Sequence, residues 1–238
     1  MTEYALYVES GPKRRKTMVH ILDLLGCIAQ GPTTDDALDA TPDAIRAFLR
    51  FLRAHGEPGD PEAAFTTVIA EHVMEGVWLG QGNPTPGFRR DFEPLSAEEL
   101  AGYLQRLRWM RQGFSELIGG LTPDPLLARP GTGRPIFGII EHVVEADCAY
   151  LRSTVGKVDG LLPATKAVLR LPDDLPAALD NLWAIGAARL AAMTEDERTR
   201  QVAHGQSTWT ARRGLRRMLE HQREHLVELS GRLGAPVA

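Results

Sequence analysis

The sequence predicts an α+β protein, with a small strand-rich first part, residues 1–75, and an all-α second part, residues 95–238. Short strand-like runs bounded by Gly and Pro dominate the first part. In the second part, apolar residues recur at the spacing of amphipathic helices over four long segments. The residues in between, 76–94, are rich in Gly and Pro, which is typical of a linker.

The first part is predicted to have the element order β-β-β-α-β. Its strands are expected at Tyr4–Glu9, Met18–Leu22, Gly26–Gln30 and Phe65–Ala70. The helix begins at Thr33, because Thr33 followed by Asp36 resembles a capping box in which Asp replaces the usual Glu or Gln. Pro42 lies inside this helical pattern and predicts a kink or a break there.

The stretch from Gly76 to Pro94 is expected to connect two folding units. It contains the run Gly80-Gln81-Gly82-Asn83-Pro84-Thr85-Pro86-Gly87. Gly and Pro in this density interrupt regular structure. We therefore expect the stretch to separate two hydrophobic cores, with domain boundaries at 1–75, 76–94 and 95–238.

Four helices are predicted after this stretch. Ser96 followed by Glu99 forms a capping box that opens the first helix. This first helix is expected to end at about Gly119. The other three are expected from about Pro135 to Thr154, from about Asp173 to Met193, and from about Thr210 to Leu233. Four helices of this length predict a four-helix bundle with long connections after the first and second helices.

The composition excludes several classes of protein. The net charge of −4 gives no overall attraction to nucleic acid or to an anionic membrane. Two cysteines, Cys27 and Cys148, are too few for a disulfide scaffold, so a cytoplasmic location is expected. The first residues lack the pattern of a signal peptide, and no apolar run is long enough to span a membrane.

Three histidines form the one pattern that points to chemistry. His221 and His225 are four residues apart in the last predicted helix, so both imidazoles lie on one face. His142 lies in the second predicted helix, also at the edge of an apolar stripe. Imidazole is the commonest protein ligand for zinc and related metals. Three such ligands can hold one face of a divalent ion and leave positions open for water or substrate.

Other interpretations of these histidines remain open. A histidine on an amphipathic helix is usually a hydrogen-bonded interface residue. The sequence from His221 to His225 also fits the H-x-x-E-H pattern of inverted zincins. That protease needs a further acidic ligand downstream, and Glu228 is the sole acidic residue after His225. Gln222 excludes the H-E-x-x-H pattern, and Cys148 is expected to point away from His142.

The second part resembles the DinB/YfiT-like family of metalloenzymes. The resemblance rests on Ile140–Asp147, on Trp209 and on Leu215–Leu226. It implies a four-helix bundle with a divalent metal, zinc or nickel, held by one histidine of the second helix and two of the last. The matching positions are His142, His221 and His225. Relatives that are mycothiol-dependent isomerases or bacillithiol S-transferases imply a low-molecular-weight thiol as a second cofactor or substrate.

The first part resembles the HicB antitoxin-like domain. The residues that carry this are Leu22–Cys27 and Gln30–Leu38, together with the β-β-β-α-β order. Leu25 stands where the family usually has proline, and the basic run Lys13–Lys16 replaces its usual turn. The resemblance implies a protein partner. No DNA-binding motif follows, so nucleic acid is not expected, and the basic run is interpreted as a solvated hairpin tip.

Two functional hypotheses follow. In the first, the chain is a metal-dependent enzyme of the DinB-like type, a thiol-cofactor S-transferase or isomerase, or a hydrolase. Glu145, three residues after His142, is then the candidate general base or a hydrogen-bond partner of the site; an exposed helix carboxylate is the alternative. In the second, the chain is a non-catalytic interaction or regulatory protein with a metal-binding or structural bundle. A homodimer is the expected assembly if the chain associates with itself.

Overall fold

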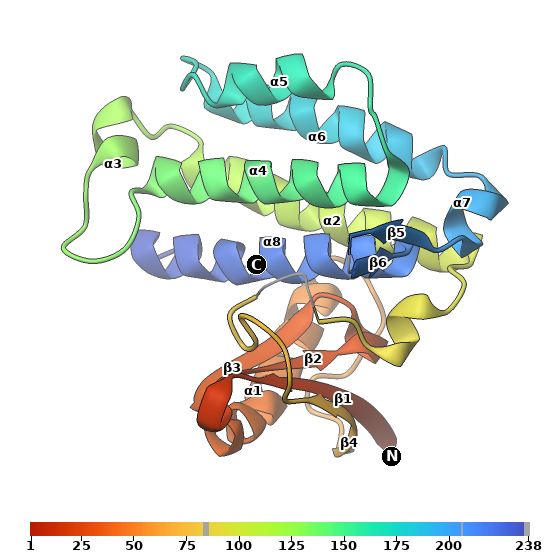
Figure 1. Ribbon diagram of the computed structural model, residues 1–238. Helices are drawn as coiled ribbons and strands as arrows, with labels where there is room; N and C mark the ends of the chain where they lie inside the picture. The colour runs from red at the N-terminus through yellow and green to blue at the C-terminus, as the bar shows by residue number, and fades with distance from the viewer. Residues whose placement is uncertain (83–85, 206, 236–238) are drawn as a thin grey trace.

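The computed structural model describes residues 1–82, 86–205 and 207–235. It confirms an α+β protein with a strand-rich N-terminal part and a helical C-terminal part. Figure 1 shows the two parts as layers, with the sheet and its helix on one side of helix α8 (Ala211–Leu233) and the other long helices on the opposite side. None of the described helices is long and apolar enough to cross a bilayer.

The N-terminal part has the predicted element order. Its elements are β1 (Thr2–Ser10), β2 (Arg15–Ile21), β3 (Cys27–Thr33), α1 (Thr34–Ala54) and β4 (Phe65–Val73). Short 3₁₀ turns, η1 (Pro12–Arg14) and η2 (Leu22–Leu24), flank β2. The strand order is β3-β2-β1-β4, with β4 parallel to β1 and the other pairs antiparallel. A parallel pair needs a crossover connection, which here includes β2, β3 and α1.

Helix α1 begins as the capping pattern predicts but does not break at Pro42. The Thr33 side chain accepts a hydrogen bond from the Asp36 backbone N–H at 3.2 Å. The helix continues through Pro42 to Ala54, so of the predicted kink or break, the break is wrong. Its apolar face, with Ile45 and Phe48 almost fully buried, packs on the sheet and holds the helix together where proline removes one backbone donor.

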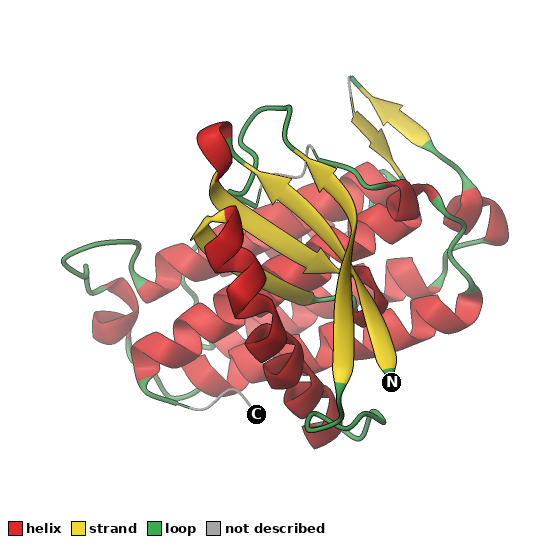
Figure 2. Ribbon diagram, turned by 90° about the horizontal axis from the view of Figure 1, so that it is seen from below, coloured by secondary structure: helices red, strands yellow, loops and turns green. Residues whose placement is uncertain are grey.

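The sheet is a layer between α1 and α8. Side chains alternate between the two faces of a strand. On one face, Ser10 of β1 bonds to Thr34 of α1. On the other, His20 of β2 bonds to Glu220 of α8, and Gln30 of β3 bonds to Glu224. Figure 2 shows the sheet and α1 lying across the helices of the C-terminal part.

The four long helices of the C-terminal part are confirmed. They are α2 (Ala97–Ile118), α4 (Ile136–Val155), α6 (Leu175–Ala191) and α8. Ser96 and Glu99 form the predicted capping box of α2. Several short elements were not predicted: η3 (Arg89–Phe92), α3 (Pro123–Leu127), α5 (Leu161–Val168), α7 (Glu195–Thr199), β5 (Val202–His204) and β6 (Ser207–Trp209). Each is too short for apolar periodicity to reveal it.

The expectation of two separate hydrophobic cores is wrong, because the buried apolar side chains form one cluster that includes both parts. Residues 83–85 of the expected linker lie outside the described residues. In the described remainder, Leu79, Phe88 and Asp91 are buried. Arg106 of α2 also donates to the Leu25 carbonyl at 3.1 Å and joins the two parts. The domain boundaries themselves stay predictions.

A buried ionic network fastens the sheet to α8. Arg216 forms a two-pronged pair with Asp91, at 2.7 and 2.9 Å. Arg216 and Arg217 both donate to Glu220, and Glu220 accepts from His20 at 2.9 Å if that ring nitrogen carries the proton. These side chains are almost completely buried. We call His20, Asp91, Arg216, Arg217 and Glu220 the ionic network.

Candidate metal centre

The three predicted histidines come from two helices that pack side by side. Thr210 caps α8 through a bond from the Arg213 N–H, and the helix then runs unbroken through His221 and His225. Four residues make slightly more than one turn, so both rings lie on one side of α8. His142 lies in the second turn of α4, which packs against α8.

The three imidazole rings meet at one point. The ring centroids of His142, His221 and His225 lie 4.6–5.0 Å apart. One ring nitrogen from each lies within 4.8 Å of the other two. The Nε2 atoms of His142 and His221 are only 3.1 Å apart. This arrangement, the histidine cluster, matches the convergence that the sequence spacing predicts.

Hydrogen bonding leaves ring nitrogens free to face the centre of the cluster. Nδ1 of His225 lies 2.8 Å from Oε2 of Glu228, and the other oxygen of Glu228 accepts from Arg232 at 2.5 Å. This fixes the orientation of the ring and leaves its Nε2 for another partner. Nδ1 of His221 is buried and has no hydrogen-bond partner among the described residues.

Burial keeps two of the imidazoles neutral. Burial lowers the pKa of His221 well below its ordinary value, and the neighbouring His225 and Arg217 add to the effect. Burial also lowers the pKa of His142, with a further contribution from Arg134. Neutral imidazole is the form that binds metals. His142 and His221 therefore offer lone pairs rather than positive charge.

Two further side chains form a wall of the cluster and were not predicted. The Tyr150 ring meets the His221 ring edge-on, with centroids 5.9 Å apart. The Arg217 guanidinium lies 5.8 Å from the centre of the Tyr150 ring. Arg217 precedes His221 by four residues, so the same helical spacing that identified His225 also pointed to it. Glu228, three residues after His225, is detectable in the same way.

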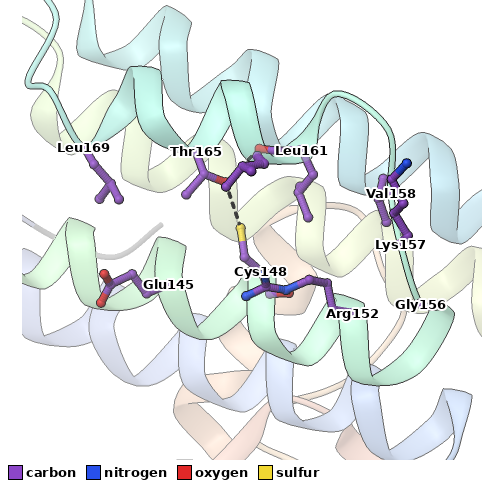
Figure 3. A pocket seen from close by; sticks show the side chains of 10 residues that line it. Glu145, Cys148, Arg152, Gly156, Lys157, Val158, Leu161, Thr165 and Leu169 are labelled. Atoms are coloured by element: carbon purple, nitrogen blue, oxygen red, sulfur yellow. Dashed lines mark hydrogen bonds between the residues drawn. The ribbon is translucent and has the colours of Figure 1, made fainter.

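Glu145 and Cys148 lie in a separate cavity. Figure 3 shows Glu145, Cys148 and Arg152 in a row along α4, facing α5. The cavity between these helices has a volume of about 750 Å³. Cys148 Sγ lies 3.2 Å from Thr165 Oγ1, in agreement with its exclusion as a ligand. Glu145 is exposed, and its role as a general base stays a prediction.

A model of the DinB superfamily matches residues 106–229, slightly more than half of the chain. The chain belongs to the DinB superfamily. His142, His221 and His225 of this DinB-superfamily chain all lie inside the matched range. Comparison with curated proteins and with solved structures gives no match.

The superfamily match tests only part of the sequence interpretation. The match begins at residue 106 and does not include the N-terminal sheet, so the resemblance of residues 1–75 to HicB stays a prediction. It supports the DinB interpretation of the histidines over the inverted-zincin pattern. In the described residues, Glu228 bonds to His225 Nδ1 and is not part of the group of convergent metal-ligating atoms.

Proposed function

We propose that this DinB-superfamily chain is an enzyme that depends on a divalent metal ion, zinc or nickel, and acts on a low-molecular-weight thiol as an S-transferase or isomerase. The observation that carries the proposal is the convergence of nitrogen atoms from His142, His221 and His225. The superfamily membership supports it, because the histidines lie in the matched range.

The dimensions of the histidine cluster fit a bound ion. Two nitrogen ligands that lie about 2.0–2.1 Å from zinc at a tetrahedral angle are about 3.4 Å apart. The His142 and His221 Nε2 atoms are 3.1 Å apart, close to this spacing. The three ring nitrogens lie within 4.8 Å of one another, so the cluster would contract around an ion. Three imidazole nitrogen donors suit zinc and nickel better than magnesium or calcium, which prefer oxygen.

The chain's own residues would prepare the site for a thiol. A divalent ion at the cluster supplies positive charge that stabilises a thiolate near neutral pH. Glu228 orients His225 through Nδ1, which keeps Nε2 directed away from Glu228. Tyr150 covers one side of His221 and limits access of water. Glu145 remains the candidate proton acceptor from its place three residues after His142, but its side chain lines the cavity toward α5, so it would have to turn toward the cluster to act there.

Metal content provides the first test. The full chain is stripped with chelator, reloaded with Zn²⁺ or Ni²⁺, and measured by elemental analysis and competition titration. We expect one ion per chain in the wild type and none retained by His221→Ala. His204→Ala is the matched control, because His204 lies in an exposed hairpin and bonds to the Ser153 carbonyl. Equal metal content in wild type and His221→Ala would refute the site.

Thiol binding tests the chemistry. Calorimetry with 2-mercaptoethanol is carried out on metal-loaded wild type and on His225→Ala. We expect binding to the wild type and a large loss in the variant, because two histidines rarely hold a catalytic ion. Equal binding would mean that the thiol does not contact the metal. No binding to either protein would favour the non-catalytic interpretation, in which the bundle is a binding or structural unit.

A further inference from the structure

A second cavity lies where the N-terminal sheet meets α8. Its volume is about 520 Å³. Both parts of the chain contribute to its walls, through Lys16, Thr17, Gln30, Gly80, Gln81 and Glu224. We call it the junction cavity. Its lining is mainly polar, in contrast to the leucine-rich cavity between α4 and α5.

Glu224 connects the junction cavity to the histidine cluster. It stands in α8 between His221 and His225, about 60° around the helix from the first and about 100° from the second. Glu224 lines the junction cavity and belongs to the same stretch of α8 that carries His221 and His225.

The walls of the junction cavity are held in place by contacts between the two parts. Gln30 of β3 donates to Glu224 Oε1 at 2.8 Å. The Gly82 carbonyl accepts a hydrogen bond from Arg217 of α8. Gly80 lies so close to the Lys16 carbonyl that an added Cβ would be 1.4 Å from that oxygen. The chain at Gly80–Gly82 is thus fixed between β2 and α8.

The junction cavity presents one positive and one negative group. Lys16 and Glu224 both line it, and neither forms an ion pair with any residue that the structure describes. The amides of Gln30 and Gln81 add neutral donors and acceptors. A ligand with an ammonium group and a carboxylate can satisfy both charges, whereas an apolar or purely anionic ligand leaves Glu224 uncompensated.

We propose that the junction cavity binds the zwitterionic portion of the substrate, a thiol derived from an α-amino acid with free ammonium and carboxylate groups. The inference rests on the proposed function for the location of the sulfur. The ammonium group contacts Glu224, and the carboxylate contacts Lys16. The N-terminal part is then a substrate-binding component of the site, and Gln30 positions Glu224 for this contact.

The test uses a probe that does not depend on the metal. S-Methyl-L-cysteine carries both charged groups, but its sulfur cannot become a thiolate. Its binding to the metal-free full chain is followed by ligand-detected NMR titration. We expect binding to the wild type, and about ten- to a hundredfold weaker binding to Glu224→Gln and to Lys16→Gln, as is usual when one charge-assisted contact is lost.

Matched controls separate the cavity from general charge effects. Glu116→Gln makes the same substitution on the exposed side of α2. Like Glu224, Glu116 accepts a hydrogen bond from a glutamine amide, here that of Gln112 at 2.8 Å. Lys13→Gln removes a lysine from the exposed turn before β2. Both controls should bind the probe as the wild type does, and circular dichroism should show all variants folded.

The outcomes distinguish this inference from the proposed function. The inference is overturned if the wild type does not bind the probe. It is also overturned if Glu224→Gln and Lys16→Gln bind the probe as tightly as the wild type does. An equal loss in the two control variants also overturns it, because the effect would then be unspecific. If the metal-free chain binds the probe but the metal-loaded chain does not bind 2-mercaptoethanol, the binding role of the junction cavity stands and the proposed thiol reaction is refuted.

Discussion

Two polar clusters meet on adjacent residues of α8, and they differ in how their charges are balanced. Glu220 belongs to the ionic network, and the next residue, His221, belongs to the histidine cluster. In the ionic network, Arg216 lies between Asp91 and Glu220. In the histidine cluster, the rings face one another, and among the described residues Glu228 is the carboxylate that bonds to a ring nitrogen.

The same burial has opposite consequences in the two clusters. Burial alone lowers the pKa of a histidine. At His20 burial is the largest influence, but the Glu220 and Glu9 carboxylates together outweigh it, and the pKa is raised. At His221, with positive groups nearby, the pKa is lowered well below the ordinary value. The ionic network therefore pairs its positive groups with buried carboxylates, whereas the histidine cluster is suited to receive a cation.

The largest effect should come from breaking the ionic network. Asp91→Ala removes the carboxylate that forms the two-pronged pair with Arg216. The buried guanidinium then has as its carboxylate partner Glu220, which it shares with Arg217. Such losses cost about 3–5 kcal/mol of unfolding free energy. Urea unfolding of the metal-free chain, followed by circular dichroism, measures it. We expect His221→Ala to lose far less under these conditions, because no oppositely charged partner is removed.

Asp159→Ala is the control for that measurement. Asp159 pairs with Lys157, but both side chains are about 90% exposed, at 93% and 89%. Exposed pairs contribute little to stability. If Asp91→Ala had the same unfolding free energy as the wild type, the ionic network would not stabilise the fold. The proposed difference between the two clusters would then be wrong.

A smaller effect should appear in metal affinity when the partner of His225 is removed. Glu228→Ala leaves the three histidines in place but frees Nδ1 of His225. Loss of such a partner typically lowers metal affinity about 10- to 100-fold. Competition titration with a zinc chelator measures it, with Glu116→Ala as the control. Unchanged affinity would mean that Glu228 does not orient the ring.

The sequence predicts the histidine cluster much better than the ionic network. His221 and His225 stand at regular helical spacing, so one rule places both rings on one face. The Asp91–Arg216 pair joins residues 125 positions apart, and Asp91 lies in a stretch whose Gly and Pro content suggested a linker. No local pattern predicts that the stretch would fold back and bury a carboxylate against α8.

The same distinction explains the successes and failures in the fold. Thr33 and Ser96 were placed correctly as helix caps because capping is a local hydrogen-bonding event. The break expected at Pro42 was wrong because long-range packing of α1 on the sheet outweighed a local penalty. The single core was missed for the same reason, since contacts between the two parts depend on tertiary structure.

The smallest effect we predict concerns the pH dependence of the ionic network. The groups that face His20 are Glu9 from β1 and Glu220 and Arg216 from α8. Because the folded-state pKa of His20 is raised, protonated His20 stabilises the fold fully below its unfolded pKa of about 6.5. That contribution is lost as the pH rises through the folded-state value.

His20→Gln isolates this contribution. The difference in unfolding free energy between wild type and His20→Gln should be largest near pH 6 and should shrink as the pH rises above it. Urea unfolding in chelator at a series of pH values measures the difference. In a Glu9→Gln background the decline should be complete at lower pH, because a carboxylate that raises the folded-state pKa of His20 is absent. A difference that grew with pH would show that His20 is buried as the neutral imidazole, and the two clusters would then hold their histidines in the same charge state.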